Sequence, residues 1–271
     1  MEAGREGLGR TALVTGASAG IGQAFAELLA ARGYAVVLTA RRVDRLEQVA
    51  AALRERWGVA AYVEPADLSD PAAPEALCRR LADRGLAIDV LVNNAGYGVA
   101  GRFLATEWPR HREFLQVMVT AVAELTHRLL PGMVARRWGR VINVASLAGL
   151  VPAAAGHTLY GASKALLVKF SEALAAEVRA DGVHVTAVCP GFTYSEFHDV
   201  SGTRARVSRM PRWLWLDARE VAEDGYAAVM AGRPLSVTGR VNRTIAFLAK
   251  HLPQAVVDRV VRRTSGAYRK V

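Results

Sequence analysis

The feature that most constrains this chain is a strand, a glycine-rich turn and a helix that follow one another near its start. Thr11 to Thr15 is an apolar run typical of a buried strand, and residues 23–32 have helical spacing. Between them lies Gly16-Ala17-Ser18-Ala19-Gly20-Ile21-Gly22. Such a junction exposes backbone amides at a helix N-terminus, where the helix dipole favours an anion. We therefore expect a phosphate-binding turn, although a turn that only reverses the chain is the alternative. Its contacts would be Gly16, Ser18, Gly20, Ile21 and Gly22.

A second apolar run, Ala35 to Thr39, ends in Ala40-Arg41-Arg42, and no acid follows until Asp44. The end of the second strand is where a dinucleotide-binding unit meets the adenosine ribose. A carboxylate there binds a free 2′-hydroxyl, whereas arginine accommodates a 2′-phosphate. The pattern favours NADP(H) over NAD(H), with Arg41 and Arg42 as contacts. Two solvated arginines that open a helix are the alternative.

Tyr160 and Lys164 are four residues apart in a segment with helical spacing, so both side chains should lie on one face. A free phenol has a pKa of about 10 and moves protons poorly near neutrality. A neighbouring ammonium would favour the phenolate, so we expect Lys164 to lower the pKa of Tyr160. The pair alone is also compatible with a half-buried tyrosine beside a solvated lysine.

Seven elements in chain order decide between these interpretations, and they span about residues 11 to 193. The elements are Gly16, Gly20, Gly22, Asn93-Asn94-Ala95-Gly96, Ser146, Tyr160 and Lys164. In this combination the chain resembles a short-chain dehydrogenase/reductase of the NADP-preferring, Tyr-x-x-x-Lys type.

The resemblance implies a role for each of these residues. Tyr160 would exchange a proton with the substrate oxygen, Ser146 would hydrogen-bond the same oxygen, and Lys164 would bind the nicotinamide ribose. Tyr160 and Lys164 would therefore also contact the cofactor. Asp67 and Leu68 would lie at the adenine, and Asn94, Ala95 and Gly96 near the ribose. The nicotinamide amide would be held by Pro190, Gly191 and Thr193.

One position departs from the family pattern. Relatives usually place an asparagine in the long fourth helix, where it anchors a water that links the lysine to solvent. Here that position is Met118, whose thioether cannot hold water as an amide does. Three explanations stay open: the proton relay uses another route, turnover is slow, or the alignment is shifted.

Strand and helix signals alternate along the chain, which predicts one α/β domain. Strand candidates recur near residues 11, 35, 60, 88, 141, 183 and 235. We expect a doubly wound parallel sheet of the Rossmann type with about seven strands and helices on both faces. Residues 1–10 should be a disordered tail, residues 11–239 the catalytic domain, and residues 240–271 a C-terminal helical extension.

The net charge of +10 is concentrated in that extension, which carries eight basic residues against Asp258 alone. Apolar residues recur there at helical spacing. The segment could contact an anionic membrane surface or an acidic partner such as a carrier protein, or it could pack on the domain with its arginines solvated. No stacking platform accompanies the charge, so we expect no nucleic acid partner.

Residues 194–216 are irregular and rich in arginine, and the family resemblance makes them a substrate lid. Trp213 and Trp215 would close over an apolar substrate or serve only in packing. Cys78 and Cys189 are too few for a disulfide framework, so we expect a cytoplasmic protein, with peripheral membrane contact left open. The histidines lack the spacing of metal ligands, so we expect no metal.

Together these patterns predict an NADPH-dependent reductase of a lipophilic ketone, such as a 3-oxoacyl thioester or a steroid-like compound. An NADP(H)-binding sensor or scaffold with little turnover is the alternative, and NAD-linked oxidation is a third. The resemblance also implies a homo-oligomer, a dimer or tetramer, formed through the fourth and fifth helices, roughly residues 107–137 and 160–180.

Overall fold

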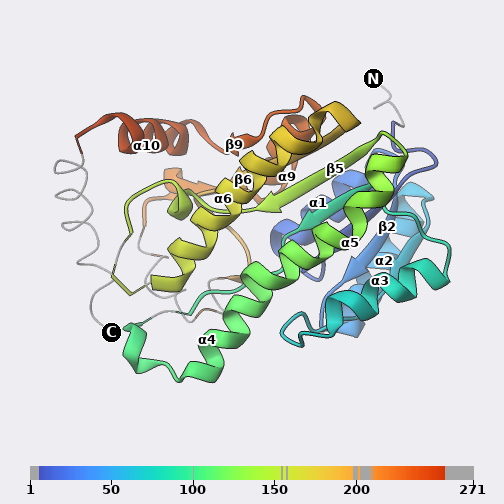
Figure 1. Cartoon of the computed structure of the whole chain (residues 1–271), viewed down its shortest axis with the longest axis horizontal. Coiled ribbons are helices and arrows are strands. Elements are labelled where there is room, and N and C mark those ends of the chain that lie inside the picture. Colours follow the sequence, from blue (N-terminus) through green and yellow to red (C-terminus); the bar gives the residue numbers. More distant parts are fainter. Residues whose placement is uncertain are drawn as a thin grey trace.

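The computed structural model describes residues 6–99, 101–153, 155–156, 158–197, 201, 208 and 210–253. At its centre is a seven-stranded sheet with the order β3-β2-β1-β4-β5-β6-β9, in which every neighbouring pair is parallel (Figure 1). This confirms the predicted doubly wound sheet. The strands are β1 (Thr11–Thr15), β2 (Ala35–Thr39), β3 (Ala61–Val63), β4 (Val90–Asn93), β5 (Gly139–Val144), β6 (Val183–Cys189) and β9 (Leu235–Val237).

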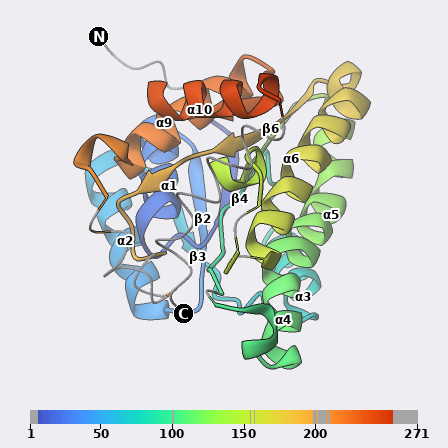
Figure 2. The same cartoon turned by 90° about the vertical axis from the view of Figure 1, so that its left-hand side faces the viewer.

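Two layers of helices cover the two faces of the sheet (Figure 2). Because both faces are covered, the central strands are almost continuous apolar runs. On one face lie α1 (Gly20–Ala31), α2 (Val43–Trp57) and α9 (Ala218–Met230). On the other lie α3 (Ala73–Asp83), α5 (Ala121–Ala135) and α6 (Thr158–Val178). A short helix, α4 (Trp108–Leu115), runs into α5 through a π-helical turn at Gln116–Thr120.

The order of the strands reverses between β1 and β4. Chain connections therefore leave these two neighbouring strands in opposite directions and open a crevice at their carboxyl ends. The phosphate-binding turn expected after β1 and the Asn93–Gly96 run at the end of β4 both lie at this crevice. The fold thus brings together two motifs that are about eighty residues apart.

The beginning of the chain differs from the expected disordered tail. Glu6 forms an ion pair with Arg32, with 2.6 Å between Oε1 and Nη1, and it accepts a hydrogen bond of 2.8 Å from the Tyr226 hydroxyl. The Gly7 amide donates to the Arg32 carbonyl. Residues 6–10 are therefore bound to α1 and α9, while residues 1–5 lie outside the described part.

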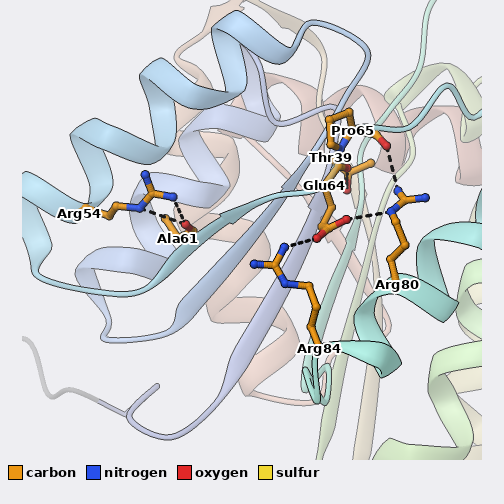
Figure 3. A network of polar contacts seen from close by, with 7 residues as sticks. All are labelled: Thr39, Arg54, Ala61, Glu64, Pro65, Arg80 and Arg84. Carbon is orange, nitrogen blue, oxygen red and sulfur yellow. Dashed lines mark hydrogen bonds and ion pairs between the residues drawn. The ribbon is translucent and has the colours of Figure 1, made fainter.

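A buried carboxylate fixes the end of β3 (Figure 3). Glu64 is 5% exposed and forms ion pairs with Arg80 and Arg84 at the end of α3. The Thr39 hydroxyl, at the end of β2, donates to the Glu64 carbonyl over 2.9 Å. Since a buried charge is tolerated when it is paired, this network holds the ends of β2 and β3 together just before Arg41 and Asp67.

The last described helix, α10 (Arg240–His251), is attached to the domain through Asn242. Asn242 is 4% exposed, and a methyl group placed on Gly191 would lie 2.6 Å from its amide. No helix within the described residues is long and apolar enough to cross a membrane. Residues 254–271, which carry most of the basic charge of the extension, lie outside the described part.

Candidate active site

One cleft of about 910 Å³ opens at the carboxyl ends of the strands. Every residue that we predicted for the site lines it except Gly22. The predicted residues that line it are Gly16, Ser18, Gly20, Ile21, Arg41, Arg42, Asp67, Leu68, Asn94, Ala95, Gly96, Ser146, Tyr160, Lys164, Pro190, Gly191 and Thr193. Gly22 lies behind the turn, where a methyl group would be 2.2 Å from the Gly16 carbonyl oxygen. Its role is therefore to let the turn close.

Hydrogen bonds tie the glycine turn to the end of β4. The Thr15 hydroxyl oxygen accepts from the amides of Asn94 and Ala95, each over 3.0 Å, and the Asn94 side chain donates to the Thr15 carbonyl over 2.9 Å. At the same turn, α1 begins without a side-chain cap and without an acidic residue in its first turn. Its first amides are consequently available to an anion in the cleft.

Exposed charged side chains form one end of the cleft. Arg42 donates to the Ser18 hydroxyl over 3.0 Å, and it also forms a 2.7 Å ion pair with Glu196. Arg41 is exposed beside it. The Asp67 carboxylate accepts from the Ser69 amide and hydroxyl over 3.0 and 2.8 Å, which orders the loop after β3. This end therefore combines two cations with a carboxylate that is fixed by its own loop.

The other end of the cleft contains the three predicted catalytic residues. Ser146 follows β5 and accepts a 3.1 Å hydrogen bond from the Ala148 amide. Lys164 is 6% exposed and donates from Nζ to the Val144 carbonyl over 2.6 Å. That ammonium lies 5.8 Å from the centre of the Tyr160 ring. The end of β5 thus positions both Ser146 and Lys164 beside Tyr160 on α6.

The pKa values at this end correct one expectation. Desolvation raises the pKa of Tyr160, and the hydrogen bond with the Ser146 side chain opposes this rise only in part. Burial lowers the pKa of Lys164 to about 8. We expected Lys164 to lower the pKa of Tyr160, but the ammonium is directed at a backbone carbonyl, and burial dominates. The phenol is therefore held in its protonated form.

Met118 lies inside the π-helical turn between α4 and α5 and is 1% exposed. A methyl group on Gly96 would meet its sulfur at 2.8 Å. The thioether therefore packs against the end of β4. A π-helical turn accommodates an additional residue in a helix, so it shifts which side chains face the cleft. The sequence spacing of the fourth helix did not reveal this π-helical turn.

Further residues that the sequence analysis did not name for the site also line the cleft: Ser195, Glu196 and Phe197, which belong to the expected lid, and Asn242 and Ile245. A methyl group on Gly20 would lie 2.8 Å from Cβ of Ser195, so this segment lies directly over the glycine turn. The Phe197 and Tyr160 ring centres are 5.7 Å apart. Proximity in sequence to Pro190 and Gly191 was the available signal for Ser195 to Phe197. No motif signalled Asn242 or Ile245.

The two lid tryptophans differ in their surroundings. Trp215 belongs to a small two-stranded sheet of β7 (Phe192–Thr193) and β8 (Trp215–Leu216), and it stacks on Tyr194 with ring centres 4.7 Å apart. Trp213 is 67% exposed. Trp215 therefore serves in packing, whereas Trp213 is exposed to solvent and, unlike its neighbour Leu214, does not line the cleft. Arg204, Arg206 and Arg209 lie outside the described residues.

Comparisons with known proteins place the chain in a family. The family profile described as short chain dehydrogenase matches residues 10–204, most of the chain. The chain belongs to the short-chain dehydrogenase/reductase family. It is 35% identical over 243 residues to a 3-oxoacyl-[acyl-carrier-protein] reductase of Vibrio harveyi, a match that covers 85% of this chain and 96% of that protein.

Solved structures agree with this assignment. A short-chain dehydrogenase from Sphingobium yanoikuyae in complex with NADPH has a TM-score of 0.78 at 30% identity, covering 95% of this chain and 94% of that one. A family member from Burkholderia phymatum in complex with NAD has a TM-score of 0.80 at 26% identity, covering 90% and 93%. The protein is thus an oxidoreductase of a family whose members bind a nicotinamide cofactor.

Proposed function

We propose that this protein is an NADPH-dependent reductase of ketones, and in reverse an oxidant of secondary alcohols, with Tyr160 as the proton donor. The observation that carries the proposal is the composition of the cleft. Ser146, Tyr160 and Lys164 lie at one end, and Arg41 and Arg42 lie at the other. The glycine turn between them connects a catalytic end with an adenosine end.

The residues of the cleft fit NADP(H). The uncapped amides of α1 suit a pyrophosphate, and the two arginines suit a 2′-phosphate. The hydroxyl of Tyr97 is buried, lines the cleft and has no hydrogen-bond partner among the described residues. A buried hydroxyl without a partner costs free energy, so Tyr97 is a second candidate for substitution when cofactor binding is tested.

The side chains supply orientation and a proton. The bound nicotinamide would supply or accept the hydride. Ser146 would hold the substrate oxygen by a hydrogen bond, and Tyr160 would donate its phenol proton to that oxygen. The raised pKa of Tyr160 keeps that proton in place at neutral pH, which suits reduction. Lys164 would hold the cofactor ribose beside them.

The substrate that we propose is lipophilic, and 3-oxoacyl thioesters come first. Apolar side chains line part of the cleft, among them Leu147, Val151, Leu214 and Ile245. Each Å² of apolar surface that a substrate buries against these side chains contributes roughly 25 cal/mol to the free energy of binding. The 3-oxoacyl-[acyl-carrier-protein] reductase similarity and the basic net charge, which would suit an acidic carrier protein or coenzyme A, both favour the thioester class.

The test is NADPH consumption by the purified protein across 3-oxoacyl thioesters, steroid ketones and small aldehydes. We expect the highest kcat/KM with a long-chain 3-oxoacyl thioester. Binding of NADPH without consumption of any ketone would instead indicate the sensor or scaffold alternative. Met118 was the one sequence feature in favour of that alternative. The packing of Met118 against Gly96 gives the sensor or scaffold alternative no further support.

Two assembly properties also stay predictions. We expect a dimer or tetramer formed through the fourth and fifth helices, which light scattering coupled to size-exclusion chromatography would measure. Contact of the basic extension with an acidic carrier or an anionic membrane is checked by sedimentation with vesicles of stated charge. A chain ending after Pro253 is the control for that contact.

A further inference from the structure

The arginine that we assign to the 2′-phosphate already has a carboxylate partner from a distant part of the chain. The Arg42 guanidinium forms its 2.7 Å ion pair with Glu196, which is 154 residues away in sequence. The same nitrogen of Arg42 also donates to Ser18 in the glycine turn. Glu196 therefore lies at the adenosine end of the cleft, where the end of β2 offers no acid.

Packing on both sides of Glu196 holds it there. Ser195 lies against Gly20 of the phosphate-binding turn, and the Ser195 hydroxyl accepts a 3.4 Å hydrogen bond from the Phe197 amide. Phe197 in turn lies beside the Tyr160 ring. Since the backbone on both sides is fixed, the ion pair forms at a smaller entropic cost than one between two free surface side chains.

The two kinds of cofactor meet this pair differently. A 2′-phosphate carries close to two negative charges and needs Arg42, so it must compete with the Glu196 carboxylate. A 2′-hydroxyl is uncharged and leaves the ion pair intact. It can also donate a hydrogen bond to a carboxylate, as the acid at the end of the second strand does in NAD-binding units.

We propose that Glu196 is a cofactor-specificity residue that weakens the preference for NADP(H) and allows NAD(H) to bind. The inference rests on the proposed function, because it assumes that a nicotinamide cofactor occupies this cleft with its ribose at Arg42. It predicts that a change at Glu196 shifts the Kd values for NADPH and NADH in opposite directions or by unequal factors. Arg42 and Glu196 are 46% and 42% exposed, so the effect is modest, about threefold to tenfold.

The experiment measures Kd for NADPH and NADH by fluorescence titration of the full chain. Glu196→Gln should lower the Kd for NADPH about threefold to tenfold and leave the Kd for NADH unchanged or raised. The control is Glu223→Gln, which removes the same charge from an exposed ion pair with Arg219 on α9, away from the cleft. It should change both Kd values less than twofold.

A double substitution separates direct competition from a structural effect. In Arg42→Ala, the additional change Glu196→Gln should no longer shift the NADPH to NADH ratio as it does in the wild type, because the contested arginine is gone. An unchanged ratio in Glu196→Gln overturns the inference, as does an equal shift for both cofactors. Failure of the proposed function looks different: the wild type then consumes no NADPH with any ketone, although the Kd comparison can still be made. If the wild type binds neither cofactor, the inference falls with the proposed function.

Discussion

The two ends of the cleft are built differently. At the catalytic end, Lys164 is 6% exposed and bonded to a backbone carbonyl, and Ser146 is held by a backbone amide. At the adenosine end, Arg42 is 46% exposed and held by a side-chain ion pair. Buried contacts to the backbone fix geometry before a ligand arrives, whereas exposed ion pairs are weak and are easily exchanged for a ligand. The catalytic end is therefore preorganised, and the adenosine end is adjustable.

The largest effect in a test of this comparison is expected at Tyr160, in the catalytic end. Tyr160→Phe removes the proton donor while keeping the ring against Phe197, so kcat for ketone reduction should fall about 10²- to 10⁴-fold with little change in the Kd for NADPH. Steady-state kinetics and fluorescence titration measure the two quantities. Tyr194→Phe, at an exposed tyrosine that stacks on Trp215, is the matched control and should keep full activity. A similar loss in both variants would argue against a proton transfer from Tyr160.

At the adenosine end the effect should appear in binding. Arg42→Ala removes charge-assisted hydrogen bonds worth about 1.5–3 kcal/mol, so KM for NADPH should rise at least tenfold while kcat changes little. Arg56→Ala, at the opposite end of α2, is the control. If kcat fell instead and KM stayed constant, the adjustable end of the cleft would not lie at Arg42.

The pH profile tests the preorganised end. The pKa of Lys164 is lowered to about 8, so its positive charge is present below that pH and is lost above it. The pKa of Tyr160 is raised above its usual value, so the phenol stays protonated through this range. We therefore expect kcat/KM for reduction to fall about tenfold per pH unit above 8. A profile that stays flat up to pH 10 would mean that Lys164 is fully charged and solvated.

The smallest effect should come from the lid. Trp213 is 67% exposed and lies next to Leu214, which lines the cleft, so we expect its ring to add only a small contact with a ligand. Trp213→Ala should raise KM for long acyl or polycyclic ketones about twofold to fivefold and leave small aldehydes unaffected. Trp57→Ala, at a tryptophan at the end of α2, is the control. Equal KM values for every accepted substrate would make Trp213 a surface residue without a role.

Much of the fold followed from the sequence because its signals are local. Buried parallel strands produce continuous apolar runs, and Gly20, with φ of 58°, adopts a backbone conformation that favours glycine. The order of the motifs then placed Ser146 at the carboxyl end of β5, and Tyr160 and Lys164 near the start of α6. These elements were predictable because each depends on a few adjacent residues.

The remaining features depend on contacts between distant residues. Glu196 meets Arg42 across 154 residues, and Asn242 of α10 packs on Gly191, neither of which any spacing indicates. The pKa of Tyr160 was expected in the wrong direction because helical spacing gives the Tyr160 to Lys164 separation but not the burial that dominates it. The ordered residues 6–10 likewise owe their structure to Arg32 and Tyr226.

The central claim is that this cleft transfers a hydride from NADPH to a ketone while Tyr160 supplies the proton. The most direct measurement uses NADPH deuterated at the transferable position, a 3-oxoacyl thioester, and mass spectrometry of the product. The account predicts a 3-hydroxyacyl thioester with one deuterium at the carbinol carbon, and almost none of it with Tyr160→Phe. A product without deuterium, or equal product from Tyr160→Phe, would contradict it.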